Sequence, residues 1–82
     1  GFFNIHKLDQ QVLQNALMDF ETDILLNALF GADKKTVEAI LKIRPPREGE
    51  MIKSELESGR TVSNASRSMA RKEMLNKLRK FA

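Results

Sequence analysis

The sequence contains no cysteine and a single histidine, so several kinds of site are excluded at once. Without cysteine, the chain has neither a disulfide framework nor a thiolate metal site, which suits a reducing compartment without proving one. A metal site needs several donor side chains at matched spacing, and His6 stands alone near Phe3 and Ile5. We therefore interpret His6 as a surface or packing residue, with no metal or catalytic role.

Long apolar runs are also missing. No run approaches the roughly 20 residues of a membrane-spanning helix, and the N-terminus lacks the basic-then-apolar order of a signal peptide. The 82 residues predict one helical domain over 1–82, near the lower limit for burying a core without covalent or metal support. Because the chain begins with Gly1 rather than Met, we expect it to be a subdomain of a longer, multidomain protein.

Sequence signatures of enzymes are absent as well. There is no glycine-rich phosphate loop, no HExxH motif, and no serine with a plausible base. Asp19, Glu21 and Asp23 lie near an expected helix start, where acids stabilise the helix dipole. EF-hand spacing is missing too. The sequence therefore predicts a protein that is not an enzyme and that uses no cofactor, metal or small-molecule substrate.

What the chain does contain is helical periodicity along nearly its whole length. Apolar residues recur at steps of three and four, and no sustained alternation occurs. Each expected helix has only two or three turns and could not persist alone in water, so mutual packing must stabilise the set. The pattern predicts an all-α fold.

Capping residues and helix breakers divide the chain into these short helices. Asp9, Asp19 and Asp33 are expected N-caps, and Gly31 is expected to end the helix that follows Asp19.

Two prolines separate the next helix from the one before it. Pro46 or Arg47 can open this helix, because proline is tolerated in the first turn, and residues 58–59 should end it. The last helix should begin near Thr61 or Ser63. Apolar residues expected to face inward from these last two helices are Met51, Ile52, Leu56, Val62, Ala65, Met69, Met74, Leu78 and Phe81.

Charge is divided unevenly along the chain. The net charge is +3, but residues 1–59 hold seven Lys/Arg and ten Asp/Glu, for −3, whereas residues 60–82 hold seven Lys/Arg and only Glu73, for +6. Basic residues at a helix end complement the helix dipole, and they can also bind an acidic partner or nucleic acid. The residues that would bind nucleic acid are Arg67, Arg71, Lys72, Lys77, Arg79 and Lys80. They are spread around the helix without a docking motif, so no nucleic acid is expected.

From Phe3 to Phe81 the chain resembles the C-terminal six-helix subdomain of the FliG family, the rotor proteins of the flagellar motor switch. The positions that carry the resemblance are Phe3, Leu8, Asp9, Val12, Leu13, Asp23, Leu26, Ala28, Leu29, Gly31, Ala32, Arg47, Ile52, Glu55, Leu56, Val62, Lys72, Leu75 and Arg79. The order, the spacing and the ALxGA-like turn at 28–32 are more specific than any single residue. The resemblance implies a compact orthogonal bundle of about six short helices.

The resemblance also implies a function in motility and chemotaxis. In this family, charges on the helix equivalent to residues 46–58 meet opposite charges on the stator, a cytoplasmic loop of MotA type, to generate torque and set rotation direction. The implied location is the cytoplasmic face of the inner membrane, in the flagellar basal body. The rest of the parent chain would contact the neighbouring switch and ring subunits FliM and FliF.

Two of the family's five charged positions are kept, as Arg47 and Glu55. The other three are replaced by Ser54, where the family has a first acid, by Phe30, where it has a lysine, and by Ser63, where it has an arginine. Glu50, Lys53 and Glu57 on nearby turns are candidate substitutes. These changes indicate either a divergent FliG paralogue with a rebuilt stator contact or a chain that keeps only the fold.

An alternative is a general helical protein-interaction module without torque function. In that hypothesis Phe30 would be an exposed apolar anchor for a partner helix, although an aromatic residue there could equally pack in the core.

Overall fold

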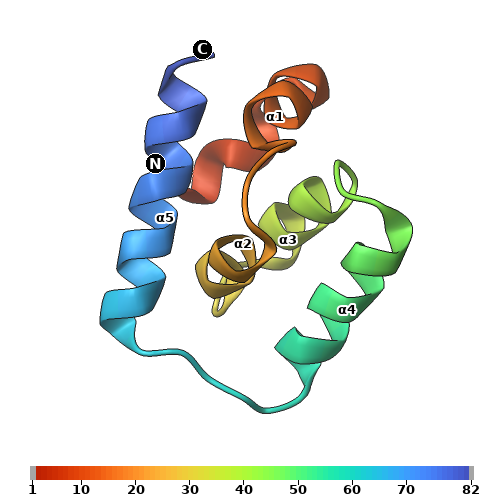
Figure 1. Ribbon diagram of the computed structural model, residues 1–82, viewed down its shortest axis with the longest axis vertical. Helices are drawn as coiled ribbons and strands as arrows, with labels where there is room; N and C mark the ends of the chain where they lie inside the picture. Colours follow the sequence, from red (N-terminus) through yellow and green to blue (C-terminus); the bar gives the residue numbers. More distant parts are fainter. Residues whose placement is uncertain (1, 82) are drawn as a thin grey trace.

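Five α-helices and one 3-10 helix make up the fold of residues 2–81 in the computed structural model (Figure 1). It describes residues 2–81; Gly1, Ala82 and the side chain of Phe3 lie outside this description. The elements in chain order are η1 (Phe2–Lys7), α1 (Gln10–Leu17), α2 (Thr22–Leu29), α3 (Lys34–Leu41), α4 (Pro46–Glu57) and α5 (Asn64–Arg79). No strand occurs between residues 2 and 81, so the predicted all-α fold of about six short helices is confirmed.

Helix α2 is at the centre of the bundle and packs most extensively against α5, which also contacts α1 (Figure 1). Leu25 of α2, Met74 of α5 and Leu17 of α1 are completely buried where these helices meet. Helix α3 packs against η1, whereas α4 contacts α2 less extensively and lies at one edge of the bundle. One side of α4 is therefore left open to solvent.

Helix starts follow the expected capping chemistry at three places. Asp9, Asp33 and Ser63 are N-caps, and their side-chain oxygens accept hydrogen bonds at 2.7, 2.9 and 3.1 Å from backbone N–H groups two or three residues further on. Each bond satisfies an N–H group that has no partner inside the helix. Pro46 is the first residue of α4, as predicted.

The prediction that Asp19 caps α2 was wrong. Asp19 is an exposed turn residue, and the N-cap position belongs to Glu21, which makes no side-chain capping bond. The physical reason lies in Phe20, whose N–H donates to the Leu17 carbonyl at 3.1 Å and whose side chain packs against the core. Because of this inward turn, α2 begins only at Thr22. The Asp19 carboxylate is then too far from the first N–H groups of α2 to cap the helix.

Four residues that were predicted to face inward point outward instead. Met51, Met69 and Phe81 are 42%, 65% and 48% exposed, and Ala65 is exposed as well. The buried stripe of α5 is formed by Ala70, Met74 and Leu78, in steps of four, and a residue adjacent in sequence is rotated about 100° away from it. Met51 precedes the buried Ile52 in sequence, so its side chain is rotated away from the bundle in the same way. Phe81 lies beyond the end of α5 and therefore does not continue its buried stripe.

Glycine ends two helices where the backbone turns into the left-handed region. Gly31, after α2, has φ of 76°, and Gly59, after α4, has φ of 85°. A side chain would strain this conformation, so both glycines act as predicted stops.

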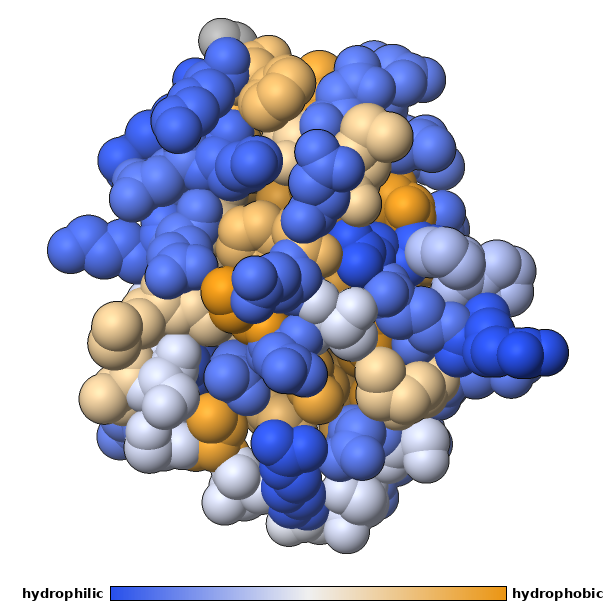
Figure 2. All heavy atoms as spheres, viewed as in Figure 1, coloured by the Kyte–Doolittle hydropathy of each residue, from blue (hydrophilic) through white to orange (hydrophobic). Residues whose placement is uncertain are grey.

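The face of the bundle seen in Figure 2 is mostly hydrophilic. Figure 2 shows charged and polar side chains spread over one face, with smaller apolar areas between them. Within residues 2–81, none of the helices has the length and apolar character needed to cross a membrane.

Candidate partner-binding surface

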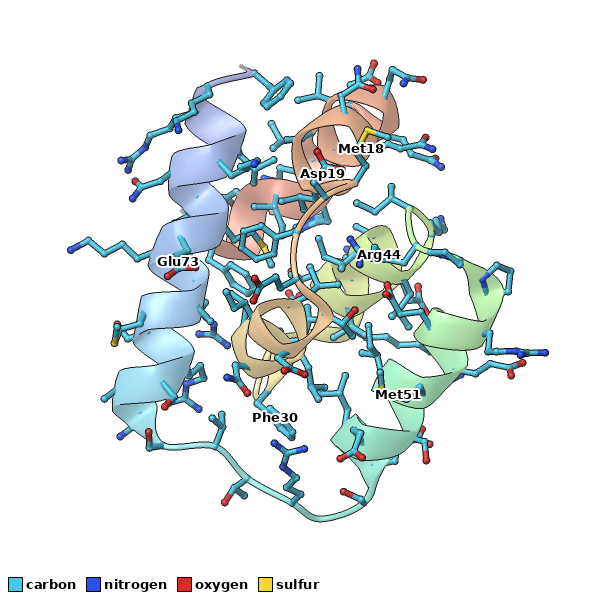
Figure 3. All side chains as sticks on the ribbon, viewed as in Figure 1. Met18, Asp19, Phe30, Arg44, Met51 and Glu73 are labelled. Carbon is cyan, nitrogen blue, oxygen red and sulfur yellow. The ribbon has the colours of Figure 1, made fainter. Side chains whose placement is uncertain are left out.

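Helix α4 is held in place through the residues around its first turn. Arg44 donates from Nη1 to the Leu17 carbonyl at 2.7 Å and from Nη2 to Oε1 of Glu48 at 2.9 Å, while its Nε donates to Oε2 of Glu48. Thr22 adds a bond from Oγ1 to Oε1 of Glu48 at 2.7 Å. Only 8% of the Arg44 side chain and 19% of the Glu48 side chain are exposed. Figure 3 shows Arg44 in the interior of the molecule, between α1 and α4. This network joins the end of α1, the start of α2 and the start of α4.

The same network acts on the charge of Glu48. The hydrogen bonds from Arg44 hold the pKa of the Glu48 carboxyl below its ordinary value of 4.5; burial opposes this effect, and the bond from Thr22 adds to it. Glu48 is therefore ionised at neutral pH and is bound on both oxygens. It also lies in the first turn of α4, where a negative charge is favoured by the helix dipole.

The inner side of α4 packs against the bundle. Ile52 is fully buried, Leu56 packs against the core, and Gly49 is buried beside Leu41 at the end of α3. A Cβ on Gly49 would lie 3.9 Å from the Leu41 carbonyl oxygen, so the backbone of α4 approaches α3 closely. With this side fixed, the opposite side of α4 must face solvent.

That solvent side carries most of the charged residues predicted to bind a partner. We call it the outer face of α4, and it consists of Arg47, Glu50, Lys53, Ser54 and Glu57, all of which are exposed. Part of this face is a shallow hollow of about 410 Å³, which also includes Ser58. Among residues 2–81, none of the four charged side chains of the face has an ion-pair partner within 4 Å.

Glu55 differs from these residues because it already has a partner. Its Oε2 accepts a hydrogen bond from Nη1 of Arg60 at 3.0 Å, and the Arg60 side chain remains 52% exposed. The arginine is placed by the turn after α4, where its backbone N–H donates to Oγ of Ser58. Glu55 therefore lies at the edge of the outer face, and in the free chain its charge is paired.

Phe30 follows α2 and is only 7% exposed, so it belongs to the core. The Arg60 guanidinium lies over its ring, 5.7 Å from the ring centre. The hypothesis that Phe30 is an exposed apolar anchor was wrong, because the residue is needed to close the core where α2 ends. Of the other two positions that differ from the family charges, Ser63 caps α5 and Ser54 lies on the outer face of α4.

The chemistry available on the outer face is the exchange of ion pairs. Its charged groups alternate in sign, are hydrated, and are presented by a helix that the Arg44 network fixes. Exposed ion pairs are each worth about 0 to 1 kcal/mol, so contacts made here form and break readily. No group of acidic or histidine side chains suited to a metal ion occurs in residues 2–81.

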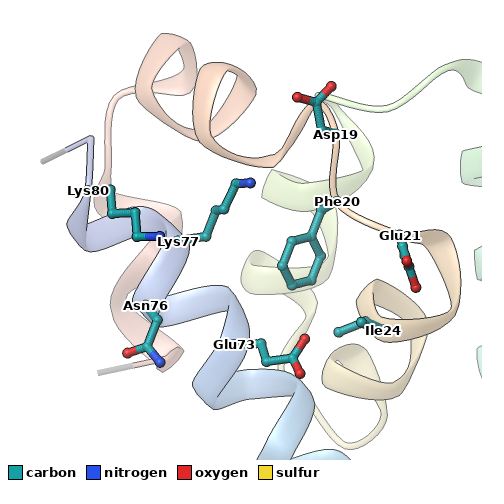
Figure 4. Close-up of a pocket in the computed structure, with 8 residues that line it drawn as sticks. All are labelled: Asp19, Phe20, Glu21, Ile24, Glu73, Asn76, Lys77 and Lys80. Carbon is teal, nitrogen blue, oxygen red and sulfur yellow. The ribbon is translucent and has the colours of Figure 1, made fainter.

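Five of the six basic residues considered for nucleic acid line two separate hollows, and Arg79 lines neither. Lys77 and Lys80 line one of them together with Asp19, Phe20 and Glu21 (Figure 4). The second hollow contains Arg67, Arg71 and Lys72. The six cations considered for nucleic acid therefore do not form one continuous surface.

Sequence reasoning missed the roles of Arg44, Glu48 and Arg60. Arg44 and Glu48 are four residues apart, a spacing that predicts a pair on one helix, but the prolines between them hid this signal. Arg60 has no such spacing to Glu55, and only the turn at Gly59 brings the two together.

Comparison with known proteins gives the same family as the sequence. The family model of the FliG C-terminal domain matches residues 1–82. The flagellar motor switch protein FliG of Vibrio cholerae serotype O1 is 36% identical over 81 residues, which cover 99% of this chain and 23% of that protein. The chain thus spans about a quarter of the length of this curated relative. The chain belongs to the FliG C-terminal domain family.

Proposed function

We propose that this chain is a component of a flagellar motor switch and that the outer face of α4 binds a cytoplasmic loop of the stator. Family membership supports the motor assignment. The observation that carries the stator contact is that Arg47, Glu50, Lys53 and Glu57 are exposed and have no ion-pair partner in the described chain. Such a face offers charges of both signs to a partner without first breaking internal bonds.

The anchoring of α4 suits this function physically. A force applied to the outer face passes into the bundle through Arg44, Glu48 and the buried Ile52 rather than bending a loose helix. The contact itself consists of weak, hydrated pairs, which can be remade at every step of rotation. A rigid support and an exchangeable contact together favour torque transfer and a bias in rotation direction.

The remaining parts of the assignment concern the parent protein. We propose that residues 1–82 are a single helical domain at the C-terminal side of a longer chain, because they correspond to 23% of the relative. The rest of that chain would bind FliM and FliF, and the motor would place this domain at the cytoplasmic face of the inner membrane. Family membership also agrees with the prediction that the chain is not an enzyme.

A second candidate is a protein-interaction module that has lost its torque function. It is favoured by the pairing of Glu55 with Arg60 and by the uncharged Ser54, because both leave fewer free acids on this side of α4 than the family pattern implies. Motility separates the two candidates, since the first requires that charge changes on α4 alter rotation.

The test is charge reversal on the outer face. Binding of the chain to a peptide of the stator loop should weaken with rising salt and with Arg47→Glu, and an opposite charge change on the peptide should partly restore it. Lys35→Glu is the matched control, because it makes the same charge change at an exposed position on α3.

Equal weakening by Arg47→Glu and Lys35→Glu would indicate only general charge attraction and would contradict the proposed contact. In cells, Arg47→Glu should reduce swimming while the protein is still incorporated into the motor. Normal swimming of that variant would favour the module without torque function.

A further inference from the structure

Two arginines of α5 converge beside the turn that follows α2. A Cβ built on Gly31 would lie 3.3 Å from Nη1 of Arg67 and 4.0 Å from Nη2 of Arg71, so the Arg67 guanidinium lies close against this glycine and the Arg71 guanidinium is in ordinary contact distance. Burial, and secondly the positive charge of Arg67, lower the pKa of Arg71. Two like charges are therefore held close together on one side of α5.

The two arginines have different surroundings. Arg71 donates from Nε to the Ala28 carbonyl at 2.9 Å and from Nη2 to the Phe30 carbonyl at 2.8 Å, and it lies over the ring of Phe2. It therefore supports the end of α2. Within the described residues 2–81, Arg67 donates only to the amide oxygen of Asn64, three residues earlier in the same helix.

The surface around Arg67 is a hollow that is rich in donors. It measures about 630 Å³, and we call it the basic hollow; its lining residues are Asn64, Arg67, Ser68, Arg71, Lys72 and Leu75. Ser68 and Lys72 are exposed, and no carboxylate of residues 2–81 lies within 4 Å of Arg67 or Lys72. The lining contains no acidic residue at all.

We propose that the basic hollow is a second binding site and that it takes a short acidic segment of a partner protein. Carboxylates of the segment would pair with Arg67 and Lys72, and Oγ of Ser68 would donate a further hydrogen bond. The planar guanidinium group suits a carboxylate because it can donate two parallel bonds. This site is independent of the outer face of α4 and does not depend on the function proposed for that face.

The dimensions of the hollow match such a segment. From Asn64 to Leu75 the helix rises about 16 Å, which is the length of about five residues of extended chain. Leu75 adds an apolar group to the lining, about one turn beyond Lys72. Duplex DNA fits this hollow less well. Only three cations line it, and Lys77 and Lys80 line the other hollow. With no more than three phosphate contacts, DNA binding would be weak at physiological salt.

The experiment measures binding of a fluorescent peptide of six glutamates to the chain by anisotropy, at several salt concentrations. We expect binding with a log-log salt slope of no more than about three, since at most three cations are engaged. The double variant Arg67→Gln, Lys72→Gln should weaken binding about five- to tenfold, as expected for two exposed charge pairs. Arg71 is left unchanged because it supports the end of α2.

The matched control is Arg79→Gln, Lys80→Gln, which removes the same charge from exposed positions outside the basic hollow. It should change binding less than about twofold, and thermal unfolding should show that both variants remain folded. Equal weakening by the two double variants, or no binding of the peptide to the unmodified chain, would overturn the proposal. Tighter binding of a short DNA duplex than of the peptide would likewise exclude a protein segment as the ligand.

Discussion

Helix α4 has one ion pair at each end, and the two differ in nearly every physical respect. At the N-terminal end, Arg44 and Glu48 are 8% and 19% exposed and also bind Leu17 and Thr22. At the C-terminal end, the side chains of Arg60 and Glu55 are 52% and 38% exposed, and the arginine lies over the ring of a core phenylalanine. Both pairs join an arginine to a glutamate only four or five positions away.

The difference between them shows that burial and additional partners decide what an ion pair does. A buried pair whose remaining donors and acceptors are satisfied is costly to break, because each group left behind stays desolvated. An exposed pair is screened by water and salt, so its loss costs little and its members can change partners. The first pair therefore fixes α4 in the bundle, and the second leaves Glu55 available to a partner.

Breaking the buried pair should have the largest effect. Arg44→Ala leaves the Glu48 carboxylate partly buried without its guanidinium partner and removes the donor to the Leu17 carbonyl. We expect the free energy of unfolding to fall by about 2 to 4 kcal/mol, measured by urea denaturation. Arg44→Lys is the control. Lysine keeps the positive charge but cannot make all three hydrogen bonds to Glu48 and Leu17, so the free energy of unfolding should fall by less than in Arg44→Ala. A loss below about 1 kcal/mol for Arg44→Ala would mean that the network does not anchor α4.

Lowering the pH should weaken the same pair by neutralising Glu48. Its pKa in the folded chain is below the ordinary value of 4.5, so the unfolded chain binds the proton more strongly. The stability it contributes is fully present above that value and is lost as the pH falls through the folded pKa. Unfolding free energies measured between about pH 6 and about pH 3 should therefore decline less in Glu48→Gln than in the unmodified chain. Identical pH profiles would contradict this origin of the acid sensitivity.

Breaking the exposed pair should have a smaller effect. Arg60→Ala should lower the free energy of unfolding by less than about 1 kcal/mol, because the pair is hydrated. The loss should shrink further when the denaturation is repeated in high salt, whereas the loss caused by Arg44→Ala should persist. If both losses responded to salt equally, burial would not be what separates the two pairs.

Reversing the charge of Arg47, which lies on α4 between the two ion pairs, should have the smallest effect on stability. Arg47→Glu removes no internal bond from the described chain, so the free energy of unfolding should stay within about 0.5 kcal/mol. The same variant is expected to weaken stator binding. A large loss of stability would show instead that Arg47 supports the fold, and its effect on binding would then have no simple interpretation.

Much of the fold could be predicted from local sequence signals. The caps Asp9 and Asp33, the first-turn Pro46 and the stop at Gly59 act over only a few residues of chain, so sequence reveals them. For α5 the sequence left two starts open, Thr61 and Ser63, and the structure has Ser63 as the cap. The orientation of single apolar residues was harder to predict. Met51, Met69 and Phe81 are apolar at plausible helical spacings, but the exact rotation of each short helix depends on what it packs against.

The candidate site was predictable only in part. The exposure of Arg47 on α4 follows from its place opposite Ile52, and that position was predicted. The sequence left open whether Phe30 is buried or exposed, and only the packing of the core decided it. The pairing of Glu55 was not predicted, because it depends on Arg60, which reaches Glu55 only after the chain turns at Gly59. That Arg47 and Glu55 bind a partner remains a prediction.

The sequence by itself determined the helical class of the chain, most helix ends and the family, since these depend on periodicity, capping and the order of residues. Only the tertiary structure decided which charges are free and which are already used. Arg44 binds Leu17, 27 positions away, and Arg71 binds Ala28, 43 positions away, and no local pattern encodes such contacts. Whether an arginine anchors a helix or awaits a partner depends on the groups that folding brings within about 3 Å of it, and on how much water folding leaves around it.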